Sequence, residues 1–451
     1  MTARILFLVI TLFTIIACSD KRGIIGKAGE IHLIQLDPAH SHAAAAQGEQ
    51  LSCLDTTVYV YAPEISAVST YFQQIKALNS RKENPTKWNE RSYFGNDYLE
   101  KMVLERKGNV VVLAGNNRIK IDYIEKSIGA GMNVFSDKPM VINGAGFTRL
   151  TKAYQKASEK GVLMFDMMTE RYSLINKIQK SLMQDSLLFG KLLPGSAAHP
   201  SVMESSVHHF YRGGKGTRPA WYFDVMQQGE GIVDVTTHLI DLTFWKSFPD
   251  KAIDYLNEVK VIAAKHWPVK LTNAQFSAAT SLPAIPSSLS KYVKDSILEV
   301  YANGSVIYQV KGVNNMVNVE WRPATPPEGN DLRNAYAEGS LSTILIQQEY
   351  GQKRPLLVIR KGEKISANDF ITQLKVSLAR LQTQYPGISF SEEENSVQII
   401  IPSGLESSYD QTFKVFAGYL INRDMPLWEV PNTLAKYFIT TTALEMAQGK
   451  E

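Results

Sequence analysis

The sequence has few cysteines and no large excess of charge of either sign. Cys18 and Cys53 are its only cysteines in 451 residues, and the formal net charge is +4. No dense run of lysine and arginine is present, so the composition gives no support to nucleic-acid binding. The hydrophobic fraction of 44% and the charged fraction of 20% are those of an ordinary globular protein.

Long hydrophobic runs are also missing. The N-terminal apolar run at 5–16 follows Arg4 and is shorter than the roughly 20 residues that a membrane-spanning helix needs. The run ends in Ile-Ile-Ala-Cys, which resembles the lipobox of bacterial lipoproteins. It predicts a signal peptide over 1–17, a lipid on Cys18 and a polar tether over 18–30. The protein is then expected to be exported and lipid-anchored to a bacterial membrane, periplasmic or outer-membrane facing. A secretory peptide with an incidental cysteine is the alternative.

A lipid on Cys18 would leave Cys53 without a partner for an intramolecular disulfide. No motif surrounds Cys53, so we expect it to be a buried or half-buried apolar filler. The membrane is expected to contact the protein through the N-terminal lipid alone.

Strands alternate with helices through the first third of the chain. Apolar runs predict strands at 31–36, 57–61, 109–115, 133–136 and 161–166, and helical patterns follow at 43–50, 66–78, 119–130 and 147–160. The polar stretch 79–94 is expected to be a loop. This alternation indicates βαβ units and predicts a Rossmann-type parallel sheet over residues 31–168.

Beyond residue 168 the pattern changes. Segments rich in β-branched residues predict strands at 259–263, 297–301, 305–310, 343–347, 356–360 and 397–401, and 432–447 is expected to be a helix. The fold class is therefore α/β followed by α+β. The second domain, over 169–451, should contain a large, mainly antiparallel open sheet with flanking helices. Two domains also agree with the length, because single cores rarely grow this large.

Two groups of polar residues have the character of a catalytic site. Lys138 stands in an Asp-Lys-Pro segment at a predicted strand end, where the proline restricts it to extended backbone. Asp234, His238 and Asp241 are spaced four and three residues apart, which predicts a single helix face. A carboxylate one turn from an imidazole can orient the ring for acid–base chemistry. For the Asp-x-x-x-His spacing alone, a structural histidine is the alternative.

The order and spacing of these motifs resemble the glucose–fructose oxidoreductase / inositol dehydrogenase / MocA family. The resemblance rests on residues 111–117, on 131–139, where the family has Glu-Lys-Pro, and on 231–241, where it has Gly-Gly-x-x-x-Asp-x-x-x-His. It covers most of residues 31–245, and the remainder resembles the extended domain of exported members. It implies hydride transfer between NAD or NADP and a hydroxyl or keto carbon of a sugar or glycoside. It also implies a homo-oligomer as a candidate assembly.

The resemblance implies roles for particular residues. His238 would take the proton of the sugar hydroxyl, Lys138 would stabilise the developing negative charge, and Asp234 would orient the site. The expected cofactor-binding residues follow the predicted strands and helix starts: Asp37, His40, His42, Glu64, Asn116, Asn117, Lys120 and Asp137. The expected substrate-binding residues are Arg171, His208, His209, Trp221 and Asp224. For Trp221, packing in the core is the alternative.

The first turn departs from the family pattern. Residues 37–42 contain no glycine, whereas a Gly-x-Gly-x-x-Gly turn lets the backbone approach the pyrophosphate of a dinucleotide. Asp37 would repel a phosphate, while His40 and His42 could supply donors or charge. Lys120 could bind phosphate, and Glu64 could hold a ribose hydroxyl.

Two alternative functions stay open. A metal-dependent sugar-processing enzyme would bind Zn or Mn through imidazoles and carboxylates, taken from His40, His42, His208, His209, His238, Asp37 and Asp234. A non-catalytic glycan-binding lipoprotein on a degenerate oxidoreductase scaffold is the second. The presence of Lys138, Asp234 and His238 together argues against this second alternative, because binding alone requires neither a base nor an oxyanion partner. Overall the residues favour an oxidoreductase, with no residue assigned to a metal.

Overall fold

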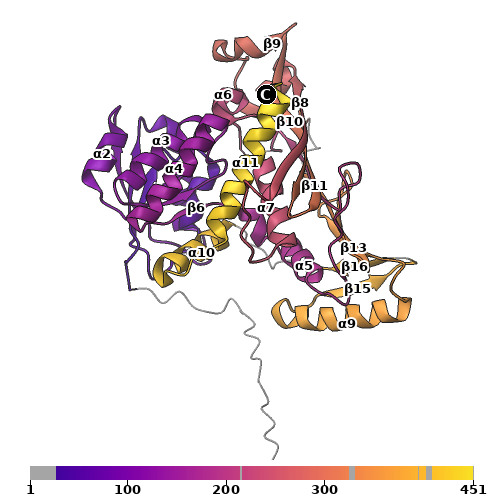
Figure 1. Ribbon diagram of the computed structural model, residues 1–451. Coiled ribbons are helices and arrows are strands. Elements are labelled where there is room, and N and C mark those ends of the chain that lie inside the picture. Colours follow the sequence, from indigo (N-terminus) through magenta and orange to yellow (C-terminus); the bar gives the residue numbers. More distant parts are fainter. Residues whose placement is uncertain (1–26, 214–215, 325–330, 395, 403–408, 450–451) are drawn as a thin grey trace, which may run out of the picture.

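The computed structural model describes residues 27–213, 216–324, 331–394, 396–402 and 409–449. The predicted signal peptide over 1–17, Cys18 and most of the tether over 18–30 lie outside the described residues. Figure 1 shows an N-terminal α/β part beside a second part built on a large sheet, with the C-terminal helix between them. Within the described ranges, none of the helices has the length and apolar character that a membrane crossing requires.

The N-terminal sheet has six parallel strands: β1 (Leu33–Leu36), β2 (Thr57–Ala62), β3 (Asn89–Phe94), β4 (Val110–Leu113), β5 (Asn133–Ser136) and β6 (Met164–Asp166). Their order is β3-β2-β1-β4-β5-β6. This is the doubly wound order of dinucleotide-binding folds, in which the direction of winding reverses between β1 and β4. The predicted Rossmann-type sheet is confirmed.

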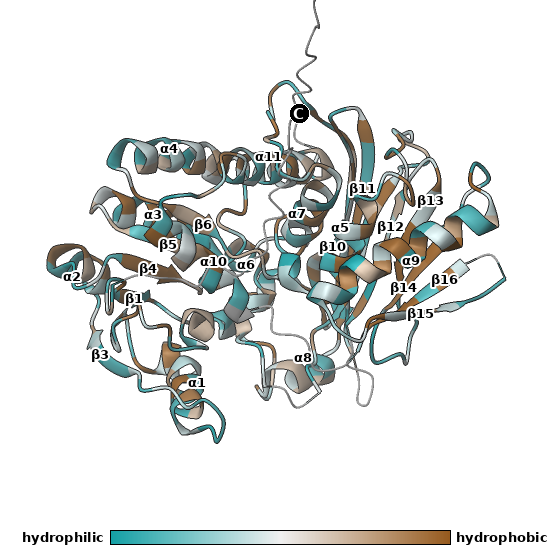
Figure 2. Cartoon of the chain, turned by 90° about the horizontal axis from the view of Figure 1, so that it is seen from below, coloured by the Kyte–Doolittle hydropathy of each residue, from teal (hydrophilic) through white to brown (hydrophobic). Residues whose placement is uncertain are grey.

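Helices cover both faces of this sheet (Figure 2). They are α1 (Ser69–Ser80), α2 (Tyr98–Glu105), α3 (Asn117–Gly129), α4 (Gly144–Lys160) and the 3₁₀ helices η1 (Ser41–Gln47) and η2 (Ser66–Val68). Side chains of α2, α3 and α4 pack on one face. Side chains of η1 and α1 pack on the other, where Cys53 is fully buried as expected.

The expected loop over 79–94 is wrong in its second half, where β3 runs parallel to β2. The sequence of β3, Asn-Glu-Arg-Ser-Tyr-Phe, has no apolar alternation, because β3 is an edge strand whose side chains are mostly not buried. Backbone pairing with β2 defines this strand, and burial contributes little. The expected helix over 43–50 is the short 3₁₀ helix η1.

Within the part of the chain that the structure describes, the second sheet has ten strands: β7 (Val202–His209), β8 (Val259–Leu271), β9 (Val293–Lys294), β10 (Ile297–Val310), β11 (Val313–Arg322), β12 (Leu332–Glu338), β13 (Ser342–Gln347), β14 (Leu356–Lys361), β15 (Ser389–Glu392) and β16 (Ser396–Ile400). The main path is β15-β16-β14-β13-β12-β7-β11-β10-β8, and β9 pairs with β10. Among the described strands of this sheet, β7 and β11 alone pair in parallel. The predicted, mainly antiparallel sheet is confirmed, and the two strands expected at 297–301 and 305–310 form one strand, β10.

The remaining helices are η3 (Thr169–Tyr172), α5 (Leu174–Met183), η4 (Ala220–Phe223), α6 (Val225–Gln228), α7 (Thr236–Ser247), α8 (Asn273–Thr280), η5 (Ser287–Tyr292), α9 (Ala367–Gln384), α10 (Tyr409–Asn422) and α11 (Glu429–Ala447). Apolar clusters join α5 and α9 to the β12–β14 and β16 side of the second sheet. Another cluster joins α7 and α11 to β10 and β11.

The C-terminal helices return to the first domain. The ring of Phe416 on α10 lies 5.3 Å from that of Phe135 and 5.5 Å from that of Phe165, centroid to centroid, within the core of the first sheet. On α11, the hydroxyl of Tyr437 accepts from the backbone N–H of Met140. The segment after residue 408 therefore holds the two sheets together, while the domain limits at 168 and 169 stay a prediction.

A buried ion network fastens α11 to the rest of the chain. Lys436 Nζ lies 2.8 Å from Asp166 Oδ2 and 3.4 Å from Asp241 Oδ1, and its side chain is fully buried. Arg171 forms bidentate hydrogen bonds to Asp241 and also binds Glu429 at 2.8 and 2.9 Å. The network links β6, η3, α7 and α11, so the stability of the interface depends on its charge balance.

Replacing Lys436 with Met is expected to lower the free energy of unfolding by about 3–5 kcal/mol, because the buried carboxylate of Asp166 loses its cation, whereas Asp241 keeps Arg171. Denaturant unfolding followed by circular dichroism measures the change. The matched control is Lys414→Met on α10, which removes a half-exposed ion pair with Glu49 and should cost less than about 1 kcal/mol. Equal losses in the two variants would contradict a structural role for the buried network.

Candidate active site

A cavity of about 180 Å³ lies where the carboxyl ends of the first sheet face the second domain. Such an edge, at the point where the strand order reverses, is where doubly wound folds bind ligands. The expected site residues that line it are His40, His42, Asn117, Asp137, Lys138, His208, Trp221, Asp234 and His238. Residues from both domains therefore share one cavity, as the motifs predict.

Lys138 is paired inside this cavity. Its Nζ donates to Asp234 Oδ1 at 2.6 Å, and Gln228 Nε2 donates to the other carboxylate oxygen at 3.0 Å. Burial alone would lower the pKa of Lys138, but the adjacent Asp234 raises the pKa above its usual value. Lys138 is therefore a fixed cation at neutral pH.

The expected couple between Asp234 and His238 is wrong. Asp234 precedes α7 instead of lying on its face, and among the described residues its carboxylate binds Lys138 and Gln228. The spacing of four residues places two residues one turn apart only within a continuous helix. Asp234 acts through the lysine, and its role in orienting the site stays a prediction.

His238 lies on α7, buried and lining the cavity. Its Nδ1 has no hydrogen-bond partner among the described residues. Burial lowers the pKa of His238 well below its usual value, and the charges of Lys138 and Arg333 lower it further. The imidazole is therefore neutral near pH 7 and can accept a proton.

The expected phosphate contact of Lys120 is wrong. Its Nζ donates to Asn117 Oδ1 at 2.8 Å and to the carbonyl oxygens of Asp137 and Pro139 at 2.9 and 3.0 Å. These three acceptors use all three ammonium hydrogens. Burial lowers the pKa of Lys120 to about 8. Lys120 therefore fixes the turn after β5 from within the core.

Three expected substrate residues do not line the cavity, and their contact with a substrate stays a prediction. Arg171 is buried in the ion network, and each of its three guanidinium nitrogens donates to Asp241 or Glu429. Asp224 caps α6 and accepts from Tyr292 Oη at 2.6 Å. His209 is buried at the end of β7, and its Nδ1 lies 3.5 Å from Oδ1 of the cavity residue Asp331.

Three expected cofactor residues also lie outside the cavity wall. Asp37 is buried and accepts from Tyr123 Oη at 3.0 Å, and burial raises the pKa of its carboxyl group. Asn116 caps α3 and donates to Gln227. Glu64 is exposed after β2, so its contact with a ribose stays a prediction.

The other cavity residues are not among the expected site residues. They are Ser41, Gly115, Thr169, Glu170, Ser206, Arg212, Arg218, Tyr222, Gln228, Val235, Leu239, Trp321, Asp331 and Arg333. The guanidinium of Arg218 lies 4.6 Å from the ring centre of Tyr222 and 4.8 Å from that of Trp321. Arg333 pairs with Glu170. Ser206 is predictable from the sequence, because it lies two residues before His208 and its side chain is thus on the same face of the strand.

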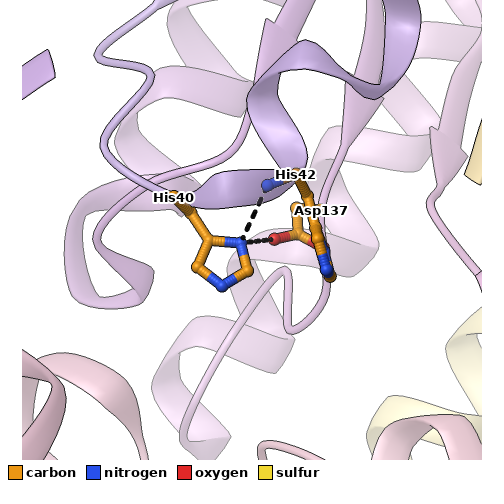
Figure 3. Close-up of side chains that lie close together, drawn as sticks. All are labelled: His40, His42 and Asp137. Atoms are coloured by element: carbon orange, nitrogen blue, oxygen red, sulfur yellow. Dashed lines mark hydrogen bonds and ion pairs between the residues drawn. The ribbon is translucent and has the colours of Figure 1, made fainter. Parts of the chain in front are cut away.

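The first turn is occupied by two imidazoles and a carboxylate (Figure 3). His40 Nδ1 lies 2.9 Å from Asp137 Oδ2, and His42 Nδ1 lies 3.0 Å from Asp137 Oδ1. Burial alone would raise the pKa of Asp137, but the two histidines hold this pKa well below its usual value. His40 Nδ1 also accepts from the backbone N–H of His42 at 3.5 Å, so it caps the start of η1.

The second half of the chain identifies its family. Residues 178–448 match the family model described as "Putative oxidoreductase C terminal domain". The crystal structure of a putative oxidoreductase from Parabacteroides merdae superimposes with a TM-score of 0.90 at 40% identity, covering 94% of this chain and 99% of that chain. The chain belongs to this oxidoreductase family.

More distant structures share the fold of the oxidoreductase. Levoglucosan dehydrogenase in complex with NADH and levoglucosan has a TM-score of 0.58 at 13% identity, covering 93% of this chain and 98% of that chain. KijD10, a 3-ketoreductase from Actinomadura kijaniata in complex with NADP and TDP-benzene, has a TM-score of 0.55 at 10% identity, with the same coverage. Comparison with curated proteins gave no match. The predicted resemblance to glucose–fructose oxidoreductase, inositol dehydrogenase and MocA is confirmed.

Proposed function

We propose that this oxidoreductase transfers a hydride between NAD or NADP and a hydroxyl or keto carbon of a sugar or glycoside. The observation that carries the proposal is the meeting of a cationic Lys138 and a neutral His238 in one cavity at the carboxyl edge of the first sheet. Levoglucosan dehydrogenase and KijD10, which share the fold, are solved with NADH and NADP respectively. The substrate and the cofactor are the proposed part.

The residues fit the reacting end of a nicotinamide cofactor. His238 Nδ1 is buried and has no hydrogen-bond partner among the described residues. A buried polar atom without a partner calls for an explanation, and a catalytic role supplies one. When bound, the nicotinamide ring would accept or supply the hydride. Lys138, just after β5, would lie beside it on the first-domain side. The pyrophosphate would meet His40 and His42 in place of a glycine turn.

The chain's own residues then divide the work. The neutral imidazole of His238 takes the hydroxyl proton as the alcohol is oxidised, and returns it when the reaction runs backwards. Lys138 donates to the same oxygen and stabilises its developing negative charge. Asp234 holds the ammonium in place. Trp221 is partly exposed and lines the same cavity, and its apolar ring is suited to the CH groups of a sugar ring.

Equilibrium binding of NADH and NADPH to the purified protein tests the cofactor, with fluorescence as the measurement. We expect saturable binding at one site per chain. Ser41→Trp should abolish it, because Ser41 lines the cavity at the start of η1, whereas Ser69→Trp at the exposed start of α1 should bind like the wild type. Binding of a glycan without either dinucleotide would favour the non-catalytic alternative.

We also propose export and lipid anchoring through Cys18, supported by the Ile-Ile-Ala-Cys segment after a short apolar run. Labelling of the expressed protein with a fatty-acid analogue tests this. Label retained by Cys18→Ala would contradict it.

A further inference from the structure

The cluster of His40, His42 and Asp137, hereafter the His–Asp cluster, stands where a Rossmann fold normally presents glycines. His40 is the residue just before η1, His42 lies within the first turn of η1, and the aspartate follows β5. One ligand atom from each of the three residues lies within 4.8 Å of the other two. Figure 3 shows both rings beside the same carboxylate. The cluster also lines the cavity that holds Lys138 and His238.

The spacing of the ligand atoms suits a metal ion. Imidazole nitrogens and carboxylate oxygens bind Zn²⁺ at about 2.0–2.2 Å, so tetrahedral ligand atoms lie about 3.3–3.6 Å apart. The two nitrogen–oxygen distances of 2.9 and 3.0 Å come within a few tenths of an ångström of that, a difference that small rotations of the rings remove. Three protein ligands beside an open cavity are the arrangement of a site that keeps a coordination position free.

The charge of Asp137 points the same way. Its side chain is nearly fully buried, and among the described residues its only ion-pair partners are His40 and His42. The two lysines nearby are committed elsewhere: Lys120 to an amide and two carbonyl oxygens, and Lys138 to Asp234. A buried carboxylate is costly without a full cationic partner. A divalent ion would supply that charge.

We propose that the His–Asp cluster binds one divalent transition-metal ion, Zn²⁺ or Mn²⁺, with its remaining coordination positions open to the cavity. Resting on the proposed function, we extend this to the ligand: the ion coordinates a phosphate oxygen of the dinucleotide. The first turn and the start of η1 are where a pyrophosphate comes closest to a Rossmann sheet. The ion then provides the positive charge at a turn that lacks the glycine cradle.

Metal content and metal affinity test the site directly. Full-length protein, purified without a histidine tag, is analysed by mass spectrometry for bound metals, stripped with chelator and titrated with Zn²⁺ and Mn²⁺ in a calorimeter. We expect one ion per chain. His42→Ala should weaken binding by more than about 100-fold, since even outer-shell partners of metal ligands are worth about 10- to 100-fold. His32→Ala is the matched control, because His32 pairs with an aspartate, Asp55, outside the cavity.

Thermal unfolding guards against a folding artefact. Added metal should raise the Tm of the wild type and of His32→Ala, and leave that of His42→Ala unchanged, since only a bound ligand shifts stability. Asp137→Asn should behave like His42→Ala. A wild type that takes up no ion, or a His42→Ala variant with wild-type affinity, would overturn the proposal and leave hydrogen bonds as the role of the cluster.

A second titration separates this site from the proposed function. NADH is added to the metal-free and to the metal-loaded wild type. We expect the metal to raise the affinity for NADH by at least about 10-fold, which is the low end of the change seen when the contacts around a bound metal are altered. Equal affinities in the two forms would refute the phosphate contact. Metal uptake with no NADH binding in either form would overturn the proposed function while the metal site holds.

Discussion

Replacing Lys138 with Met is expected to lower turnover by about 10²–10³-fold, the usual loss when one donor to a developing oxyanion is removed. The side chains are similar in length, but the variant has no hydrogen to donate and no charge. Oxidation of a panel of pyranoses, followed as reduced cofactor by absorbance, measures the change. Unchanged turnover would rule out the proposed role of Lys138.

The variant also has a cost in folding. Lys138 and Asp234 form a buried pair at 2.6 Å, with side chains 11% and 5% exposed, so the single variant leaves a buried carboxylate without its cation. We expect a loss of about 3–5 kcal/mol in the free energy of unfolding. Lys138→Met combined with Asp234→Asn removes both charges and should recover much of that stability. If turnover stays low in the stable double variant, the loss is catalytic.

Much of the fold is predictable because hydrophobic periodicity reports burial. The strands β1 and β4 are short, mostly apolar runs that are buried on both faces, the usual character of central strands in a parallel sheet. The strand β3 is not predictable in this way, since an edge strand is held by backbone pairing and can have polar side chains. The parallel pairing of β7 with β11 depends on contacts between residues far apart in the sequence.

The candidate site divides along the same line. Lys138 and Asp137 are predictable, because a polar residue directly after a parallel strand is placed by the strand itself. The partners of buried charged side chains are not predictable. The spacing in the sequence predicts a contact between Asp234 and His238, whereas in the structure Asp234 binds Lys138 and Asp241 binds Arg171. Long charged side chains reach partners on other helices and strands, and spacing along the sequence carries no information about those partners.

Substituting Ala for His238 is expected to lower turnover by about 10²–10⁴-fold, the contribution of a positioned general base. The matched control is His208→Ala. His208 lines the same cavity, but both of its ring nitrogens are occupied, Nδ1 by Asp331 at 3.1 Å and Nε2 by Ser206 at 2.9 Å. It should therefore change KM more than kcat. Steady-state kinetics of the two variants makes the comparison, and wild-type turnover in His238→Ala would contradict its role as the base.

The pH dependence of oxidation gives an independent measure of the same residue. Oxidation requires the neutral imidazole, so its rate falls as the pH drops through the pKa of His238. Burial and the charge of Lys138 lower that pKa well below the usual value of 6.5, so activity should persist into mildly acidic solution. In Lys138→Met one of those charges is gone, and the acid limb of the residual activity should move to higher pH, while His208→Ala should leave it in place. Removing the ammonium removes its repulsion of a protonated imidazole in the same buried cavity, so the pKa of the ring must rise. An acid limb that does not respond to Lys138→Met would therefore mean that another group takes the proton.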